Sequence, residues 1–140
     1  MNQWNYVRHE MELPLQVIIL YFVIPPVVFG LGVLFMRGFV RRGLLFLASL
    51  AFPVYWVTCE YLTAIGSPHS TWGNLAYTQM NFLPLIQVAS VTGLWGISFV
   101  VFLFAGAVAA LLSGTGKPWP RRALAITVGL IVCAVVGYGE

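Results

Sequence analysis

Four long apolar runs, three of them without a charged residue, restrict this chain more than any other feature. A membrane-crossing helix needs about 20 apolar residues, because the hydrocarbon core is about 30 Å thick and each residue rises 1.5 Å. Runs of this kind lie at about residues 13–36, 43–65, 94–112 and 123–139. Charged residues make up only 8% of the chain, against about 25% in a soluble domain. We therefore expect one all-α, polytopic transmembrane helix bundle, and the composition excludes a soluble enzyme, a disordered tail and a nucleic-acid-binding protein.

The third apolar stretch is too long for a single span. Residues 83–112 would form a helix of about 45 Å, which exceeds the hydrocarbon thickness. Two glycines in the run Thr92-Gly-Leu-Trp-Gly96 loosen the backbone and predict a break there. We expect a short re-entrant or interfacial helix at 83–91, followed by the true span at 94–112.

The basic residues predict the orientation in the membrane. Three arginines lie in the connection 37–42, and Lys117 with two arginines lies in the connection 113–122. The connection 66–82 has no basic residue, and the N-terminal tail has only Arg8. Basic loops remain in the cytoplasm, so both chain ends and the loop 66–82 are expected outside.

The outer loop 66–82 is polar but uncharged, and aromatic residues are interspersed in it, among them Trp72 and Tyr77. Aromatic rings with one polar edge suit the headgroup layer of a bilayer. Two interpretations are open: an ordinary aromatic belt, or a rim that binds a lipid headgroup or a partner.

Glu60 is the single acidic residue within the predicted spans. On a helix it shares a face with Trp56 and Thr63, by the spacing of three and four residues. A charge in the membrane is costly and usually faces a cavity or a partner. Glu60 is therefore expected either to orient a lipid or the outer loop, or to have a structural role at the interface.

The cysteines and histidines do not form a catalytic or metal site in the sequence pattern. Cys59 has no neighbouring base on its own helix face, because adjacent helical residues diverge by about 100°. Cys133 belongs to a stripe of small residues spaced by four, which favours close helix packing. His9 and His69 have no ligand partner at useful spacing. We expect no metal, no cofactor and no catalytic residue in this chain.

Several short motifs resemble apolipoprotein N-acyltransferases. The segment 52–62, Phe-Pro-Val-Tyr-Trp-Val-Thr-Cys-Glu-Tyr-Leu, is similar to a family helix in which a proline precedes a Trp-x-x-x-Glu pattern. The run 72–79, Trp-Gly-Asn-Leu-Ala-Tyr-Thr-Gln, resembles the periplasmic loop of the family. The runs 85–89, with Gln87, and 91–99 resemble its Gln-x-Ala and Thr-Gly-x-x-Gly-x-Ser-Phe motifs.

The resemblance implies a bacterial inner-membrane protein that takes part in lipoprotein biosynthesis. The family moves an acyl chain from phospholipid to the N-terminal cysteine of lipoproteins, using a periplasmic nitrilase-like domain with a Glu-Lys-Cys triad. That domain is not found in residues 1–140, so we expect this chain to be the lipid-binding membrane portion and to be inactive as an acyltransferase alone. The partners implied are phospholipid, a lipoprotein substrate and the nitrilase-like domain. A self-contained four-helix membrane protein, transporter-like or a scaffold subunit, is the alternative.

Motifs and loop composition together give six residues expected to bind lipid or substrate or to orient the loop: Glu60, Trp56, Trp72, Tyr77, Gln79 and Gln87.

Overall fold

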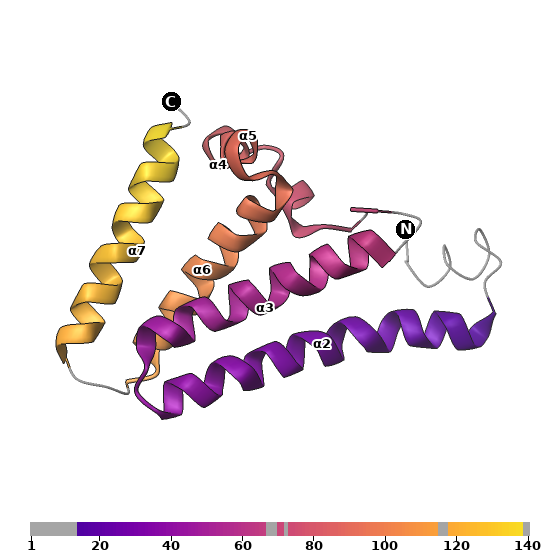
Figure 1. Cartoon of the computed structure of the whole chain (residues 1–140), viewed down its shortest axis with the longest axis horizontal. Helices are drawn as coiled ribbons and strands as arrows, with labels where there is room; N and C mark the ends of the chain where they lie inside the picture. Colours follow the sequence, from indigo (N-terminus) through magenta and orange to yellow (C-terminus); the bar gives the residue numbers. More distant parts are fainter. Residues whose placement is uncertain (1–13, 67–69, 72, 115–117, 139–140) are drawn as a thin grey trace. The chain divides into compact units, whose positions relative to one another are not determined.

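The computed structural model describes residues 14–66, 70–71, 73–114 and 118–138. The chain divides into two compact units, residues 1–31 and residues 32–140. All regular secondary structure in the described residues is helical, and four helices are long and apolar enough to cross a membrane (Figure 1). The expected all-α membrane bundle is confirmed. The helices are α2 (Leu15–Arg41), α3 (Leu45–Gly66), η2 (Leu75–Gln79), α4 (Leu83–Gln87), α5 (Ala89–Thr92), α6 (Leu94–Leu112) and α7 (Pro118–Tyr138).

The first and last long helices extend beyond the apolar runs from which they were predicted. Helix α2 continues to Arg41, and α7 begins at Pro118. Arginine is a good helix former, so the backbone remains helical after the apolar stretch has ended. Proline suits the first turn of a helix, where its missing N–H is no loss. The arginines therefore sit on helix ends, from which long side chains reach the membrane surface.

The predicted break in the third apolar stretch is confirmed at Gly93. This residue separates α5 from α6 and has a φ of +67°, a conformation that favours glycine. Gly96 is equally restricted, because a Cβ atom there would collide with the side chain of Thr92. The residues before the break form the two short helices α4 and α5 at the beginning of α6 (Figure 1).

Helices α3 and α6 form the closest pair in the unit 32–140. A Cβ atom added at Gly106 would lie 2.9 Å from the carbonyl oxygen of Ser49, so the two backbones nearly touch. Buried alanines surround this crossing, as small residues do where membrane helices approach closely. One turn further on, the rings of Phe52 and Trp56 lie 5.1 and 5.3 Å from the ring of Phe102.

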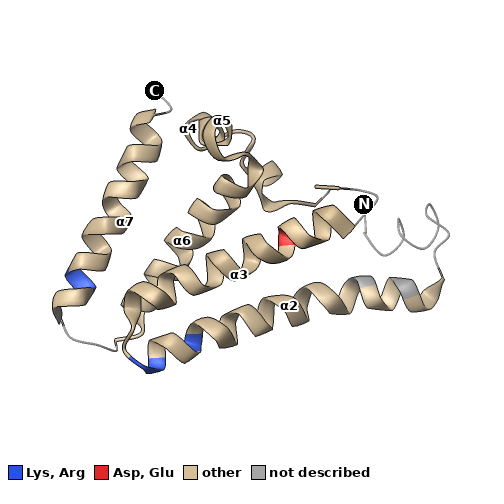
Figure 2. Cartoon of the chain, in the orientation of Figure 1, with Lys and Arg blue, Asp and Glu red and all other residues tan. Residues whose placement is uncertain are grey.

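The arginines in the described residues gather at one end of the unit 32–140. They lie near the end of α2, in the turn to α3 and near the start of α7 (Figure 2). Arg121 donates a hydrogen bond of 2.7 Å from Nη2 to the carbonyl oxygen of Leu111, which belongs to the last turn of α6. Carbonyls at the end of a helix have no partner within the helix, and a cation there is favourable. This bond joins the end of α6 to the start of α7.

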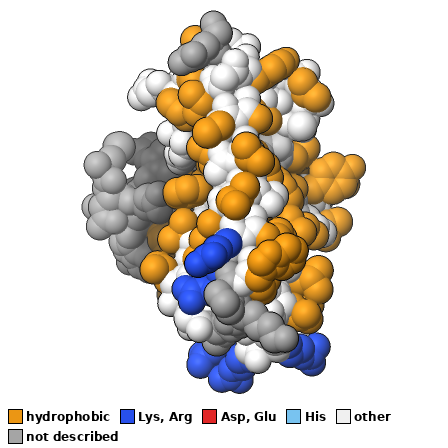
Figure 3. Space-filling view, turned by 90° about the vertical axis from the view of Figure 1, so that its left-hand side faces the viewer, with side chains coloured by type: hydrophobic (Ala, Val, Ile, Leu, Met, Phe, Trp, Pro, Cys, Tyr) orange, Lys and Arg blue, Asp and Glu red, His pale blue; other side chains and the backbone are white. Residues whose placement is uncertain are grey.

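The small-residue stripe of α7 does not pack on the described residues of this chain. Cys133 is exposed, and a Cβ atom at Gly129 or Gly137 would meet nothing within 4 Å. On the face of the molecule shown in Figure 3, apolar side chains are spread along its length, and arginines lie toward one end. Such a surface suits contact with lipid tails rather than with water.

Candidate functional site

Glu60 lies near the C-terminal end of α3, far from the arginines (Figure 2). It is half-buried and is the single acidic residue among those that the structure describes. Trp56 lies one turn before it and belongs to the aromatic cluster with Phe52 and Phe102. The aromatic rings therefore pack at least one helical turn before Glu60 along α3. The hydrogen-bond partners of the Glu60 carboxylate come from the loop instead.

The Glu60 carboxylate binds the loop through both of its oxygens. Asn74 donates from Nδ2 to Oε2 at 3.1 Å, and the backbone N–H of Leu75 donates to Oε1 at 3.3 Å. Leu75 is the first residue of η2, so its N–H is one of those that a helix leaves without an internal partner. A carboxylate at this position also meets the positive end of the helix dipole.

Asn74 connects three elements through one side chain. Its Oδ1 accepts hydrogen bonds from the backbone N–H of Ala76 at 2.8 Å and from Oγ of Ser98 at 3.1 Å. The first bond makes Asn74 the N-cap of η2, and the second reaches α6. Asn74 is 6% exposed and Ser98 is 0% exposed, so both polar groups are removed from water and satisfied by each other. We call this set the Glu60–Asn74–Ser98 network.

The remaining candidates lie around this network rather than in it. Tyr77 is exposed, and its hydroxyl is 2.8 Å from Oγ1 of Thr71. Gln79 is half-buried, donates from Nε2 to Oγ1 of Thr78 at 2.9 Å, and borders an apolar pocket. The side chain of Gln87 is exposed on α4. Trp72, like His69, lies outside the described residues.

Sequence reasoning missed the importance of Asn74 and Ser98. Both residues occur in the motifs that resemble the family, but neither was singled out. Asparagine is among the best N-cap residues, and Asn74 directly precedes η2. Ser98 is a hydroxyl within an apolar span, which needs a hydrogen-bond partner. These two signals, combined with the nearby Glu60, could have indicated the network.

The two cysteines lie on different long helices. Cys59 is half-buried within α3, and Cys133 is exposed on α7. Among the residues described, no three histidine, cysteine or acidic side chains cluster in a way that could hold a metal ion.

The fold and the site together define a multi-pass membrane protein in which a polar network joins the loop between α3 and α4 to α3 and α6. The chain belongs to the family described as the apolipoprotein N-acyltransferase N-terminal domain, which matches residues 1–107. The matched region includes all three residues of the Glu60–Asn74–Ser98 network. No solved structure matches the chain.

Three curated relatives illustrate the similarity. The chain is 33% identical over 103 residues to an apolipoprotein N-acyltransferase of Geobacter metallireducens, covering 71% of this chain and 19% of that protein. It is 30% identical over 107 residues to the enzyme of Coxiella burnetii, covering 76% of this chain and 21% of that protein. The identity reaches 42% over 59 residues with apolipoprotein N-acyltransferase 1 of Treponema denticola, covering 42% of this chain and 11% of that protein. The chain thus spans about a fifth of the length of the first two relatives.

Proposed function

We propose that this chain is the membrane portion of an apolipoprotein N-acyltransferase-like protein. Its task is to bind lipid and to hold the outer loop in a fixed position beside a nitrilase-like catalytic domain. The whole protein would then move an acyl chain from phospholipid to the N-terminal cysteine of a lipoprotein. The Glu60–Asn74–Ser98 network is the observation that supports this role most directly.

The network fits a scaffold better than a reaction centre. Glu60 uses one oxygen on Asn74 and the other on the backbone of Leu75. Hydrogen bonds to a charged group contribute about 1.5–3 kcal/mol each, which is enough to hold a short loop in one conformation. A carboxylate engaged in this way positions the chain around it, and we assign Glu60 as a positioning residue.

Acyl transfer through a covalent intermediate needs a nucleophile, a base and oxyanion stabilisation within hydrogen-bond reach. Both cysteines lie within helices that are long and apolar enough to span the membrane. We therefore assign the chemistry to the nitrilase-like domain and not to these 140 residues.

The proposed location is the bacterial inner membrane. The arginines gather at one end of the unit 32–140, and by the positive-inside rule this end faces the cytoplasm. The network and both chain ends then face the periplasm, where lipoprotein substrates are found.

The test is complementation in cells depleted of their own N-acyltransferase. The cells carry this chain joined to the remainder of a relative, and N-acylation of a lipoprotein is followed by the mass of its N-terminal peptide. Glu60→Gln and Ser98→Ala should each lower the acylated fraction at unchanged protein level, because each removes one connection of the loop. Thr58→Val is the matched control, since Thr58 is exposed on α3 and bonds only backward to Val54 in the described contacts.

Full acylation by both network variants would reject the positioning role. Full acylation in cells that carry only the remainder of the relative, without this chain, would show that acyl transfer does not need it. That result would favour the self-contained membrane protein instead.

A further inference from the structure

Arginines carry the positive charge of the described residues, and no carboxylate in that part of the chain neutralises them. They form two groups, one near the end of α2 with the turn to α3 and one near the start of α7: Arg37, Arg41 and Arg42 in the first group, and Arg121 and Arg122 in the second. The single acidic side chain of the described residues, Glu60, lies far from both groups (Figure 2). Their counter-charge must therefore come from outside this part of the chain.

The helix ends that carry the two groups pack together. One apolar cluster contains residues of all four long helices, among them Met36, Leu45, Leu111 and Leu124. Met36 directly precedes the first group, and Leu124 follows the second group by two residues. Both arginine groups therefore belong to the same end of the unit 32–140, next to the end of α6.

The turn between α2 and α3 satisfies its own backbone. The N–H of Gly43 donates to the carbonyl oxygen of Val40 at 2.9 Å, and the N–H of Leu44 donates to that of Phe39 at 3.1 Å. With a φ of +71° at Gly43, this is a Schellman motif, which occupies carbonyls at the end of α2. The guanidinium groups of this segment are not needed as caps for those carbonyls, so their N–H donors can bind a ligand.

Large apolar side chains lie beside the arginines. Leu112 at the end of α6 is 81% exposed, and Trp119 near the start of α7 is 79% exposed. Tryptophan at the end of a membrane helix is typical of the headgroup level. A ligand that contacts both the arginines and these side chains has an anionic end and an apolar end. Free phosphate has only the first of these.

We propose that this end of the protein binds one anionic phospholipid, with its phosphate between the two arginine groups and its acyl chains beside Leu112 and Trp119. Arginine binds phosphate through two parallel N–H donors. Each basic residue near an anionic membrane surface strengthens the attraction roughly fivefold. In the proposed orientation, this lipid belongs to the cytoplasmic leaflet. It is held and not consumed, and it joins the start of α7 to the turn between α2 and α3.

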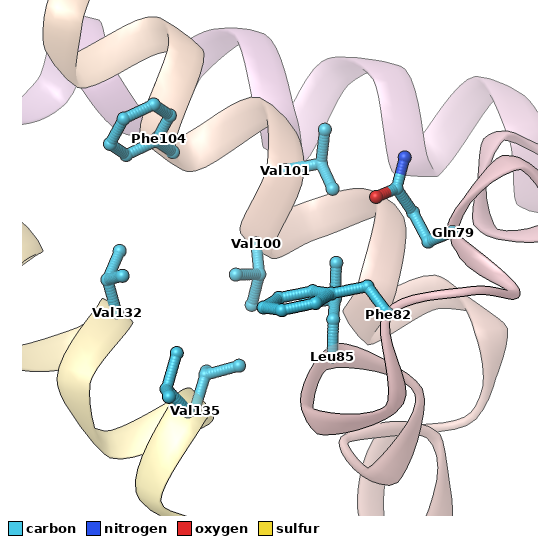
Figure 4. Close-up of a pocket in the computed structure, with 9 residues that line it drawn as sticks. Gln79, Phe82, Leu85, Val100, Val101, Phe104, Val132 and Val135 are labelled. Atoms are coloured by element: carbon cyan, nitrogen blue, oxygen red, sulfur yellow. The ribbon is translucent and has the colours of Figure 1, made fainter. Parts of the chain in front are cut away.

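This lipid is distinct from the acyl donor of the proposed function. The residues expected to bind the donor lie in or near the outer loop, and the loop is joined to α6 at Ser98. Figure 4 shows Gln79 and Phe82 at an apolar pocket together with Val100, in the first half of α6. The arginines lie beside the last turn of the same helix, where Arg121 bonds to Leu111. The proposal does not rest on acyl transfer.

The test is native mass spectrometry of the purified 140-residue chain in detergent micelles. The chain is titrated with phosphatidylglycerol or with phosphatidylethanolamine of the same acyl chains. The first molecule of phosphatidylglycerol should bind at least fivefold more tightly, and equal affinities would overturn the proposal. Glycerol 3-phosphate at the same concentration should not displace the lipid. Displacement would show that the arginines bind a free phosphate, and it would overturn the assignment to a lipid.

Two single variants test whether both groups share one lipid. Arg41→Gln and Arg122→Gln each remove one exposed arginine from one group, and each should weaken binding of the first phosphatidylglycerol roughly fivefold. Arg8→Gln is the matched control, because it removes the same charge from the N-terminal tail, and it should leave this affinity unchanged. An equal effect of Arg8→Gln would reduce the site to diffuse charge and contradict the proposal. A variant that lowers the number of bound lipids from two to one, at unchanged affinity of the remaining lipid, would contradict the shared site.

Circular dichroism checks that the variants keep their helices, and the comparison of the two lipids on the wild-type chain tests the proposal even if a variant fails to fold. The titration requires no catalytic domain. Failure of the loop-positioning role in the complementation assay would therefore leave the preference for phosphatidylglycerol intact, whereas loss of that preference would refute the arginine site alone.

Discussion

Replacing Asn74 with alanine should release the outer loop from the helices. The substitution removes the bonds to Ala76, Ser98 and Glu60 at once. Loss of an N-cap costs about 1 kcal/mol, and a buried hydroxyl left without its acceptor costs about 1–3 kcal/mol. Glu60 is half-buried and keeps its hydrogen bond from the backbone N–H of Leu75. Water therefore replaces part of the interaction that its carboxylate loses with Asn74. We therefore expect the free energy that holds the loop in its closed conformation to fall by about 2–4 kcal/mol.

Hydrogen–deuterium exchange of the backbone amides in η2 measures this cost, because these amides exchange when the loop opens. A cost of about 2 kcal/mol corresponds to roughly thirtyfold faster exchange. Asn81→Ala is the matched control, since Asn81 is an exposed asparagine in the same loop. The chain should be studied in phospholipid nanodiscs, so that the apolar helices remain in their natural solvent.

A double-mutant cycle tests whether Asn74 and Ser98 act as one unit. If they share a network, Asn74→Ala combined with Ser98→Ala should cost less than the sum of the two single variants. Unchanged exchange in Asn74→Ala, or strictly additive costs in the cycle, would refute the network as the element that holds the loop.

Three further predictions concern topology, helix packing and activity. In a background without the native cysteines, a cysteine at Ser70 should react with an impermeant thiol reagent in intact cells, whereas one at Ser113 should react only after lysis; the reverse pattern would contradict the orientation. Gly106→Ala should destabilise the α3–α6 pair by about 1–3 kcal/mol in thermal unfolding, whereas Gly129→Ala, which meets open space, should be neutral or stabilising. The 140-residue chain in phospholipid micelles should give no N-acylated lipopeptide above background; turnover that disappears in Cys59→Ala would overturn this assignment.

The helices of this protein could be predicted because each depends on local sequence. Apolar runs of membrane length predicted the four long helices, and the glycines at 93 and 96 predicted the break before α6. The helix ends were less accurate, since α2 continues through its arginines to Arg41. Hydropathy indicates which residues can contact lipid, whereas a helix can continue past these residues into water. The end of an apolar run is therefore not the end of its helix.

The contacts of the site could not be predicted in the same way, because they join distant residues. Helical spacing placed Trp56 near Glu60, but the hydrogen-bond partners of Glu60 come from 14 and 15 residues further along the chain. Ser98 is another 24 residues beyond Asn74. The apolar pocket that Gln79 borders is further from prediction still, because one of its walls belongs to α7 and depends on how that helix packs.

The distance between Asn74 and Ser98 in sequence also has a consequence for biogenesis. When the ribosome has just made the loop, Glu60 and Asn74 both exist but Ser98 does not. At about 5–20 residues per second, the 24 residues between Asn74 and Ser98 take roughly one to five seconds to synthesise. In the proposed orientation, the loop crosses the membrane during that interval without its third connection, which forms once α6 has entered the bilayer. We therefore expect the loop to acquire its final conformation only in a chain whose α6 has entered the membrane beside α3.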